Sequence, residues 1–192
     1  MKKKELTFLF IILFLVLFVA WLWTEKSKLQ TELNNDRIFI NQFQLMSGIG
    51  PLASTHQHVD VKVYISGHSI DFSQHKYQLA TNYIHFEDGH RDVIHLHATG
   101  LTTEHMLNSV KINFRNNCLM FEDQNYCDGN GKTIKFYVNG KLRNDLGTYV
   151  MNDLDKILVT YGDETPVQIQ KQLDSITDLA PKYSSASSKE TD

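Results

Sequence analysis

Apolar and polar residues alternate along several short stretches of the chain, most clearly over residues 59–65, where every second residue is Val or Ile. A period of two is typical of a β-strand that buries one face. The polar turn residues that follow indicate that this strand folds back as a hairpin. By the same reasoning, further strands are predicted at 70–72, within 77–86, at 93–98, at 133–141 and at 156–161.

Two other stretches follow the helical period. Over 101–110, apolar residues recur at helical spacing beside two threonines, which predicts a capped helix. Thr165, Pro166 and Gln168 have the form of a helix start, so a C-terminal amphipathic helix is predicted over 164–180. Strands, a helix and further strands indicate an α+β fold, in which one helix packs on a small mixed or antiparallel sheet in a β-grasp-like arrangement.

The long apolar stretch near the N-terminus shows neither the period of a strand nor that of an amphipathic helix. Leu6 to Trp23 is an uncharged run of eighteen residues, enough to cross the hydrocarbon core of a bilayer as a helix. The lysines at positions 2–4 predict that the N-terminus stays inside the cell and that the rest of the chain is exported. A cleaved signal peptide is the alternative, but the bulky residues 19–23 favour an uncleaved anchor.

These patterns divide the chain into segments. The residues after the anchor resemble a stalk that continues the membrane helix as far as Asn34–Asp36 and is broken again at 47–51. The last residues are low in complexity and are predicted to be disordered. The predicted segments are a basic cytoplasmic tail (1–5), a transmembrane anchor (6–23), a stalk (24–53), an exported α+β domain (54–163), a C-terminal helix (164–180) and a disordered tail (181–192).

All nine histidines of the chain lie in one central stretch. His56 and His58 form one His-x-His pair, and His95 and His97 form another. Each pair lies in a strand-like pattern, so its two members share one face of a strand. If the two strands are neighbours, four imidazoles lie within reach of one ion, and His85 on the adjoining hairpin arm adds a fifth. The predicted metal ligands are His56, His58, His85, His95 and His97.

The type of ligand limits the metal. Imidazole suits zinc, copper and nickel, and the missing thiolates argue against a Cu(I) or iron–sulfur site, so copper or zinc is the expected cofactor. Asp60, Glu87 and Asp92 are candidates for carboxylates that orient the imidazoles. Two alternatives need no ion. The histidines simply face solvent, or they become protonated below neutral pH and form a pH-sensitive surface. The remaining histidines are expected at the surface, namely His68, His75, His90 and His105.

The two cysteines, Cys118 and Cys127, have the spacing of two hairpin arms, and outside the cell such a pair is expected to form a disulfide. Closing so short a loop contributes about 2–3 kcal/mol in the chain-entropy model. The chain carries none of the common hydrolase, metalloprotease, phosphate-loop or dinucleotide motifs, so no catalytic residue is predicted. A net charge of −3 without a basic stripe argues against nucleic-acid binding.

One combination of motifs is similar to a known family. In order, the chain carries His-x-His before a strand, Ile70–Gln74, Ile84-His85, Ile94–His97, the Cys118…Cys127 pair, Tyr137–Gly140 and Asp155–Gly162. Over about residues 55–180, this combination resembles a family of membrane-anchored archaeal proteins with histidine-rich ectodomains. Its members often carry the name protein-disulfide isomerase, although this sequence lacks the C-x-x-C motif that such chemistry uses. The resemblance implies an archaeal, exported and anchored domain.

Three functional hypotheses follow from the sequence. The first is a single-pass membrane protein whose exported domain binds copper or zinc through the two histidine pairs, with His85 assisting. The second is a structural or adaptor ectodomain that binds a partner membrane complex. The third is a thiol–disulfide oxidoreductase, which rests on the family resemblance alone.

Overall fold

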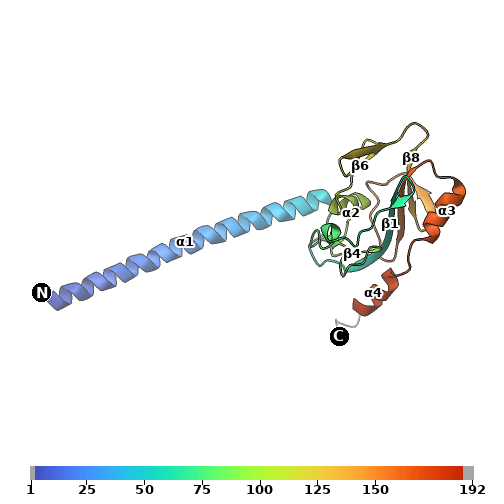
Figure 1. The fold of residues 1–192 in the computed structure, drawn as a ribbon. Coiled ribbons are helices and arrows are strands. Elements are labelled where there is room, and N and C mark those ends of the chain that lie inside the picture. The colour runs from blue at the N-terminus through green and yellow to red at the C-terminus, as the bar shows by residue number, and fades with distance from the viewer. Residues whose placement is uncertain (1–2, 188–192) are drawn as a thin grey trace. The chain divides into compact units, whose positions relative to one another are not determined.

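The computed structural model describes residues 3–187 and divides into two compact units, residues 1–48 and 49–192. The described part of the first unit is one helix, α1 (Lys3–Ser47), drawn in blue in Figure 1. At 1.5 Å per residue it is about 68 Å long, more than twice the thickness of a hydrocarbon core. It is long and apolar enough to cross a membrane, and it is longer than such a span requires.

The predicted break of this helix near Asn34–Asp36 is wrong. Each of these polar residues costs a helix only tenths of a kcal/mol, and the flanking residues are good helix formers. The helix instead ends at Ser47, where Gly48 adopts a φ of 73° and its backbone N–H donates to the carbonyl of Gln44 at 3.0 Å. A glycine with positive φ just past the last turn is the common way for a helix to end.

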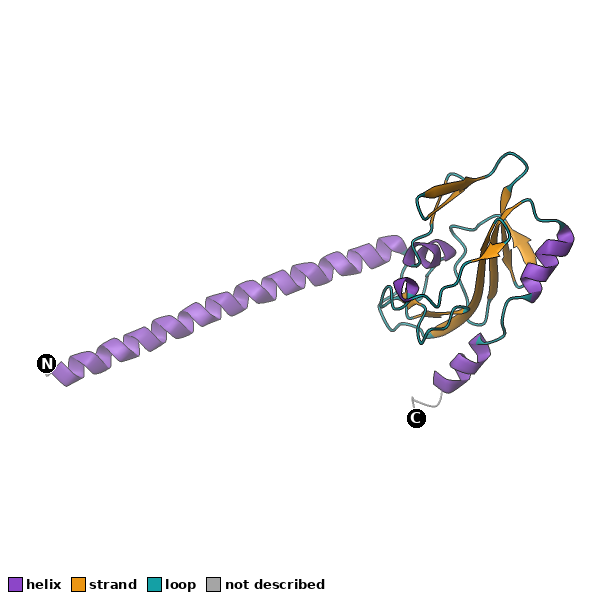
Figure 2. Ribbon diagram, viewed as in Figure 1, coloured by secondary structure: helices purple, strands orange, loops and turns teal. Residues whose placement is uncertain are grey.

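The second unit contains two sheets, drawn in orange in Figure 2. The larger has the order β3-β4-β1-β10-β8-β9, with β2 paired to β1. Its central pair, β1 and β10, is parallel, and the other pairs are antiparallel. Its strands are β1 (Gln57–Ile65), β2 (His68–Ser69), β3 (Ile84–His85), β4 (Val93–Leu96), β8 (Thr133–Val138), β9 (Lys141–Arg143) and β10 (Lys156–Gly162). The smaller sheet consists of β5 (Asn113–Arg115), β6 (Cys118–Phe121) and β7 (Gln124–Cys127).

The helices of this unit are α2 (Thr103–Ser109), α3 (Pro166–Asp174), α4 (Ala180–Ser187) and a 3-10 turn, η1 (His75–Tyr77). The predicted helix over 164–180 is therefore shorter than expected, although it begins with the predicted capping box at Thr165. A separate helix, α4, follows in the stretch that was predicted to be disordered, and residues 188–192 lie outside the described part. The strand predicted at 70–72 is wrong: the residues that pair with β1 after the turn are His68 and Ser69, which form β2. The strand predicted within 77–86 is reduced to β3.

The core lies on one face of the large sheet. Val59, Val61 and Val63 alternate onto this face with no exposed surface, and Met106 and Leu107 of α2 belong to the same buried cluster. The mixed α+β class is thereby confirmed, whereas the β-grasp-like arrangement stays a prediction. The opposite face carries the polar residues of the same strands and packs against α4, which contacts β1 (Figure 1).

Candidate metal centre

Strand register gathers the histidines on the polar face of the sheet. His58 on β1 lies directly opposite His95 on β4, and His95 lies opposite His85 on β3. These three imidazoles therefore form a row across three adjacent strands. Continuing the β1–β4 register by two residues places His56 opposite His97, on the same face. All five histidines named by the sequence pattern are thus brought to one place.

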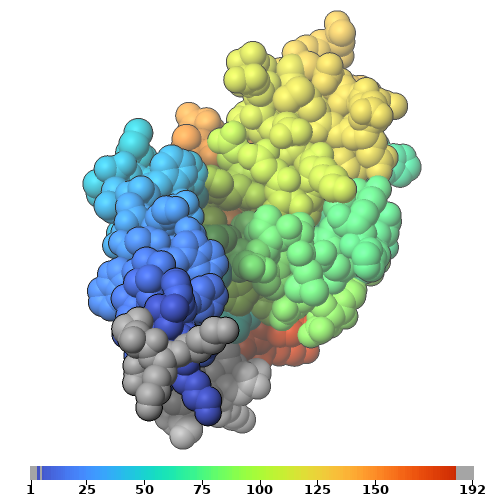
Figure 3. Space-filling view, turned by 90° about the vertical axis from the view of Figure 1, so that its left-hand side faces the viewer, coloured from blue at the N-terminus to red at the C-terminus, as the bar shows by residue number. Residues whose placement is uncertain are grey.

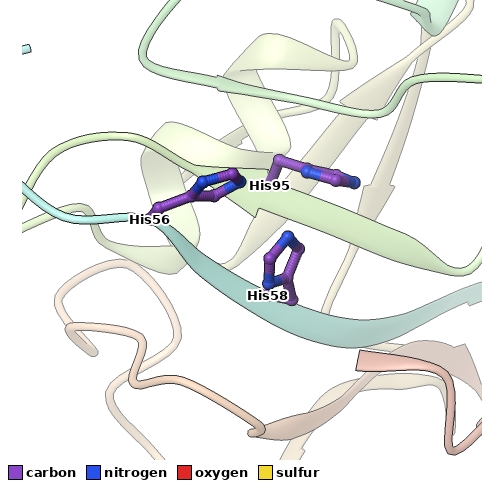
Figure 4. Close-up of side chains that lie close together, drawn as sticks. All are labelled: His56, His58 and His95. Atoms are coloured by element: carbon purple, nitrogen blue, oxygen red, sulfur yellow. The ribbon is translucent and has the colours of Figure 1, made fainter. Parts of the chain in front are cut away.

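Three of these side chains are close enough to share one ion. Each of His56, His58 and His95 offers a ligand atom, and these atoms all lie within 4.8 Å of one another (Figure 4). The ring centroids of His58 and His95 are 4.5 Å apart. His97 lies beside this triad, with its ring centroid 4.8 Å from that of His56. The ring centroids of His85 and His97 are 5.0 Å apart.

Burial keeps the central imidazoles neutral. His58 and His95 are 1% and 2% exposed. Burial, followed by the proximity of His56, lowers the pKa of His58 from 6.5 to about 4. Burial, followed by the proximity of His58, lowers the pKa of His95 to about 3, and burial also lowers the pKa of His97. At neutral pH these rings are therefore in the unprotonated form that binds metals.

A hydrogen-bonded chain fixes the tautomer of His58. The Ser184 hydroxyl donates to the Asp153 carboxylate at 3.1 Å, so it accepts from Nδ1 of His58 at 2.9 Å. The same carboxylate accepts the backbone N–H of His58 at 2.9 Å. With its proton on Nδ1, the neutral ring keeps the lone pair of Nε2 for a ligand. Oriented imidazoles of this kind are usual in metal sites.

Glu87 lies between two of the histidines. Its Oε2 atom is 3.2 Å from Nε2 of His85, and its Oε1 atom is 3.3 Å from Nδ1 of His95. The contact with His95 does not have the geometry of a hydrogen bond, and neither ring nitrogen of His95 has a hydrogen-bond partner within residues 3–187. A buried polar atom without a partner costs about 1–3 kcal/mol. A coordinated ion would satisfy it.

Helix α4 closes the polar face over these histidines, and the sequence pattern missed it. Asp60, fully buried, accepts hydrogen bonds from the Thr177 hydroxyl and from the backbone N–H groups of Leu179 and Ala180, so it holds the start of the helix on β1. Tyr183 on α4 then lies with its ring centroid 5.7 Å from His58 and 5.5 Å from His95. The proline at position 181, in the first turn, was the local signal for this helix.

Several predicted roles change. Asp60 holds α4 instead of orienting an imidazole, and Asp92 forms an ion pair with Lys62 at 2.6 Å. His90 is half-buried and hydrogen-bonds through Nε2 to the Tyr183 hydroxyl at 2.6 Å, while His105 caps α2 by accepting the backbone N–H of Thr102. The remaining two histidines, His68 and His75, are exposed as predicted.

The predicted disulfide is confirmed. Cys118 and Cys127 are direct neighbours across the β6–β7 hairpin and are bonded to each other. This hairpin, yellow-green in Figures 1 and 3, lies at the end of the domain away from α4 and therefore away from the histidines that α4 covers. The disulfide thus stabilises a separate sheet and takes no part in the candidate centre.

Comparison of the chain with protein-family models, with curated proteins and with solved structures finds no significant match. The resemblance to archaeal membrane-anchored proteins therefore stays a prediction. The class of protein that fold and site define is an α+β domain carrying a histidine cluster able to hold a metal ion, together with an apolar helix compatible with a membrane anchor.

Proposed function

We propose that this protein is a membrane-anchored, extracytoplasmic metal-binding protein that holds copper or zinc on its histidine face. His56, His58 and His95 are the principal ligands, and His85 and His97 assist. The observation that carries the proposal is the convergence of three imidazoles whose ligand atoms all lie within 4.8 Å of one another, two of them buried.

The geometry of the triad is close to that of a coordination sphere. Two nitrogen ligands, each about 2.1 Å from one ion at a tetrahedral angle, are about 3.4 Å apart. Small side-chain rotations bring nitrogens from the observed separations to this value. Because the lowered pKa values of His58 and His95 leave both rings neutral at pH 7, an ion does not have to displace a proton from either lone pair.

The choice of metal follows from the ligand set. Imidazole binds both zinc and copper well. The two cysteines of the chain form a disulfide with each other, so neither offers a thiolate ligand. In open competition Cu(II) binds such a site more tightly than zinc. The disulfide also fits an oxidising compartment, and the lysines at positions 2–4, before the apolar run, favour a domain on the extracytoplasmic side.

Metal analysis of the full chain, purified in detergent without a histidine tag, tests the proposal. The informative variant is His58→Asn with His95→Asn, and its matched control is His68→Asn with His75→Asn, which removes two exposed histidines. After equilibration with Zn²⁺ or Cu²⁺ and gel filtration, wild type and control should each retain at least one ion. The cluster variant should retain less than about a tenth of that amount. Equal metal content in all three proteins would contradict the proposal.

A second candidate function is an adaptor that binds an extended segment of a partner protein. The supporting observation is a groove of about 1100 Å³ beside β8, β9 and α3, whose lining mixes polar and charged residues with apolar ones such as Phe114, Ile134 and Leu173. β9 is the edge strand of the sheet beside this groove, and edge strands can accept a further strand. Co-purification of a partner from native membranes, lost on Leu142→Lys, would support this function.

A further inference from the structure

The part of α1 that follows the apolar run is a polar helix with an apolar stripe on one side. Six charged residues lie between positions 25 and 37, so a membrane span at the apolar run leaves residues 24–47, the stalk helix, outside the hydrocarbon. Four apolar residues on one side of the stalk helix are each more than half exposed, namely Leu29, Leu33, Ile40 and Phe43. An exposed apolar stripe of this kind marks a contact surface.

The spacing of the stripe is that of a coiled coil. Steps of four, three, four and three residues join its successive members, Leu29, Leu33, Asp36, Ile40 and Phe43. This alternation is the heptad pattern, in which two positions of every seven face a second helix. Phe39 and Met46 flank the stripe and widen it, whereas Ile38 and Leu45 lie on the opposite side of the helix.

A second copy of the chain provides a matching stripe. A helix in water gains most of its stability by packing an apolar face against another element, and the stripe is the face that the stalk helix offers. Both copies carry the same apolar run before the stalk helix, so anchoring in one membrane makes the two helices parallel and sets them at the same height. Parallel helices at the same height bring like positions of the two stripes together, as a two-stranded coiled coil requires.

Charges beside the stripe favour this parallel pairing. Glu32 lies just before Leu33 of the stripe, and Arg37 lies just after Asp36. In a parallel coiled coil these two flanking positions, five residues apart, meet across the interface. Within one helix they do not face each other, because neighbours on a helix surface are three or four residues apart. Arg37 of one copy therefore lies beside Glu32 and Asp36 of the other copy, and its charge offsets theirs.

We propose that the chain forms a parallel homodimer through residues 29–43 of the stalk helix. The two-fold symmetry of such a dimer repeats the contact between Glu32 and Arg37 on both sides of the stripe. Each dimer carries two α+β domains and therefore two histidine faces. This interface goes beyond the proposed function and needs no bound metal, although its parallel orientation rests on the membrane anchor.

Cysteine cross-linking of the full chain, in membranes of the cells that express it, tests the proposal. The two native cysteines are bonded to each other, so a short bis-maleimide reacts only with a thiol introduced into the stalk helix. Leu33→Cys, Asp36→Cys and Ile40→Cys should each give mainly covalent dimer. The matched controls on the outward side, Ile38→Cys and Gln42→Cys, should give at least about fivefold less dimer, because only the stripe faces the second helix.

Exchange of the flanking charges tests the parallel register. Glu32→Arg alone, or Arg37→Glu alone, brings like charges together across the interface. Either change should raise the dissociation constant of the full-chain dimer in detergent about tenfold, measured by light scattering over a dilution series. The double variant, Glu32→Arg with Arg37→Glu, should bind more tightly than either single variant, because opposite charges meet again.

The outcomes separate this inference from the proposed function. Equal cross-linking at all five positions, or more at Ile38 and Gln42 than within the stripe, would overturn the dimer. Absence of cross-linking within the stripe would also overturn it and would leave the stripe to lipid or to another protein. A double charge variant that dimerises no better than the single variants would refute the parallel register. The metal content of these variants should equal that of wild type, so failure of the metal site is measured independently.

Discussion

Lowering the pH from 7 to 5 should destabilise the metal-free domain through its two most buried histidines. In the folded chain the pKa of His58 is about 4 and that of His95 about 3, against 6.5 when exposed. Because both values are lowered by folding, the unfolded chain binds more protons in this range, and stability falls as the pH falls. The linkage relation gives a loss of about 2 kcal/mol from each residue, or about 4 kcal/mol together. The loss continues until the pH is below the folded pKa values.

Urea unfolding of residues 49–192 with a chelator present, followed by far-ultraviolet circular dichroism, measures this effect. That unit contains the whole buried core cluster. With a urea m-value of about 2 kcal/mol/M, the midpoint should fall by about 2 M between pH 7 and pH 5. His95→Asn removes one of the two titrating groups and should lose only about half as much over the same range. A wild-type midpoint that is independent of pH, or an equal loss in the variant, would refute the claim that these imidazoles are buried and neutral.

Three further predictions concern the surroundings of the site. Asp60→Asn weakens the attachment of α4, so amide exchange in α4 should accelerate and metal affinity should fall; unchanged exchange would contradict the anchoring role of Asp60. Ser184→Ala leaves Nδ1 of His58 without its acceptor, and competition with a chromophoric chelator should show an affinity loss of about 10-fold, an effect that a purely structural serine would not produce. Cys118→Ser should lower the free energy of unfolding by about 2–3 kcal/mol while leaving the bound metal unchanged, and loss of metal would place the disulfide in the site.

The parts of the site that depend on local pattern were predictable from sequence. The alternation around His56 and His58, and around His95 and His97, fixes which side chains share a face, because the period of a strand is two. The hairpin between the strands of His85 and His95 followed from a short turn. The α+β class and the cysteine hairpin were accessible for the same reason, since each depends on nearby residues.

The parts of the site that depend on contacts between residues distant in the sequence could not be predicted. The serine-rich stretch that forms α4 has weak helical propensity, and what holds it in place is the carboxylate of Asp60, far away in sequence. Tyr183 and Ser184 reach the histidines only because of that attachment, so no local pattern marks them as site residues. The position of Glu87 between His85 and His95 likewise depends on how β3 pairs with β4. Tertiary contacts of this kind routinely override local propensity.

In the proposed function, imidazoles from separate strands converge on one metal. X-ray absorption spectroscopy of the full chain, loaded with one equivalent of Cu²⁺ or Zn²⁺, measures this most directly. We expect nitrogen or oxygen neighbours at about 2.0–2.1 Å and outer-shell scattering from at least three imidazole rings. A first shell without imidazole scattering, or one that is unchanged in the His58→Asn, His95→Asn variant, would contradict it.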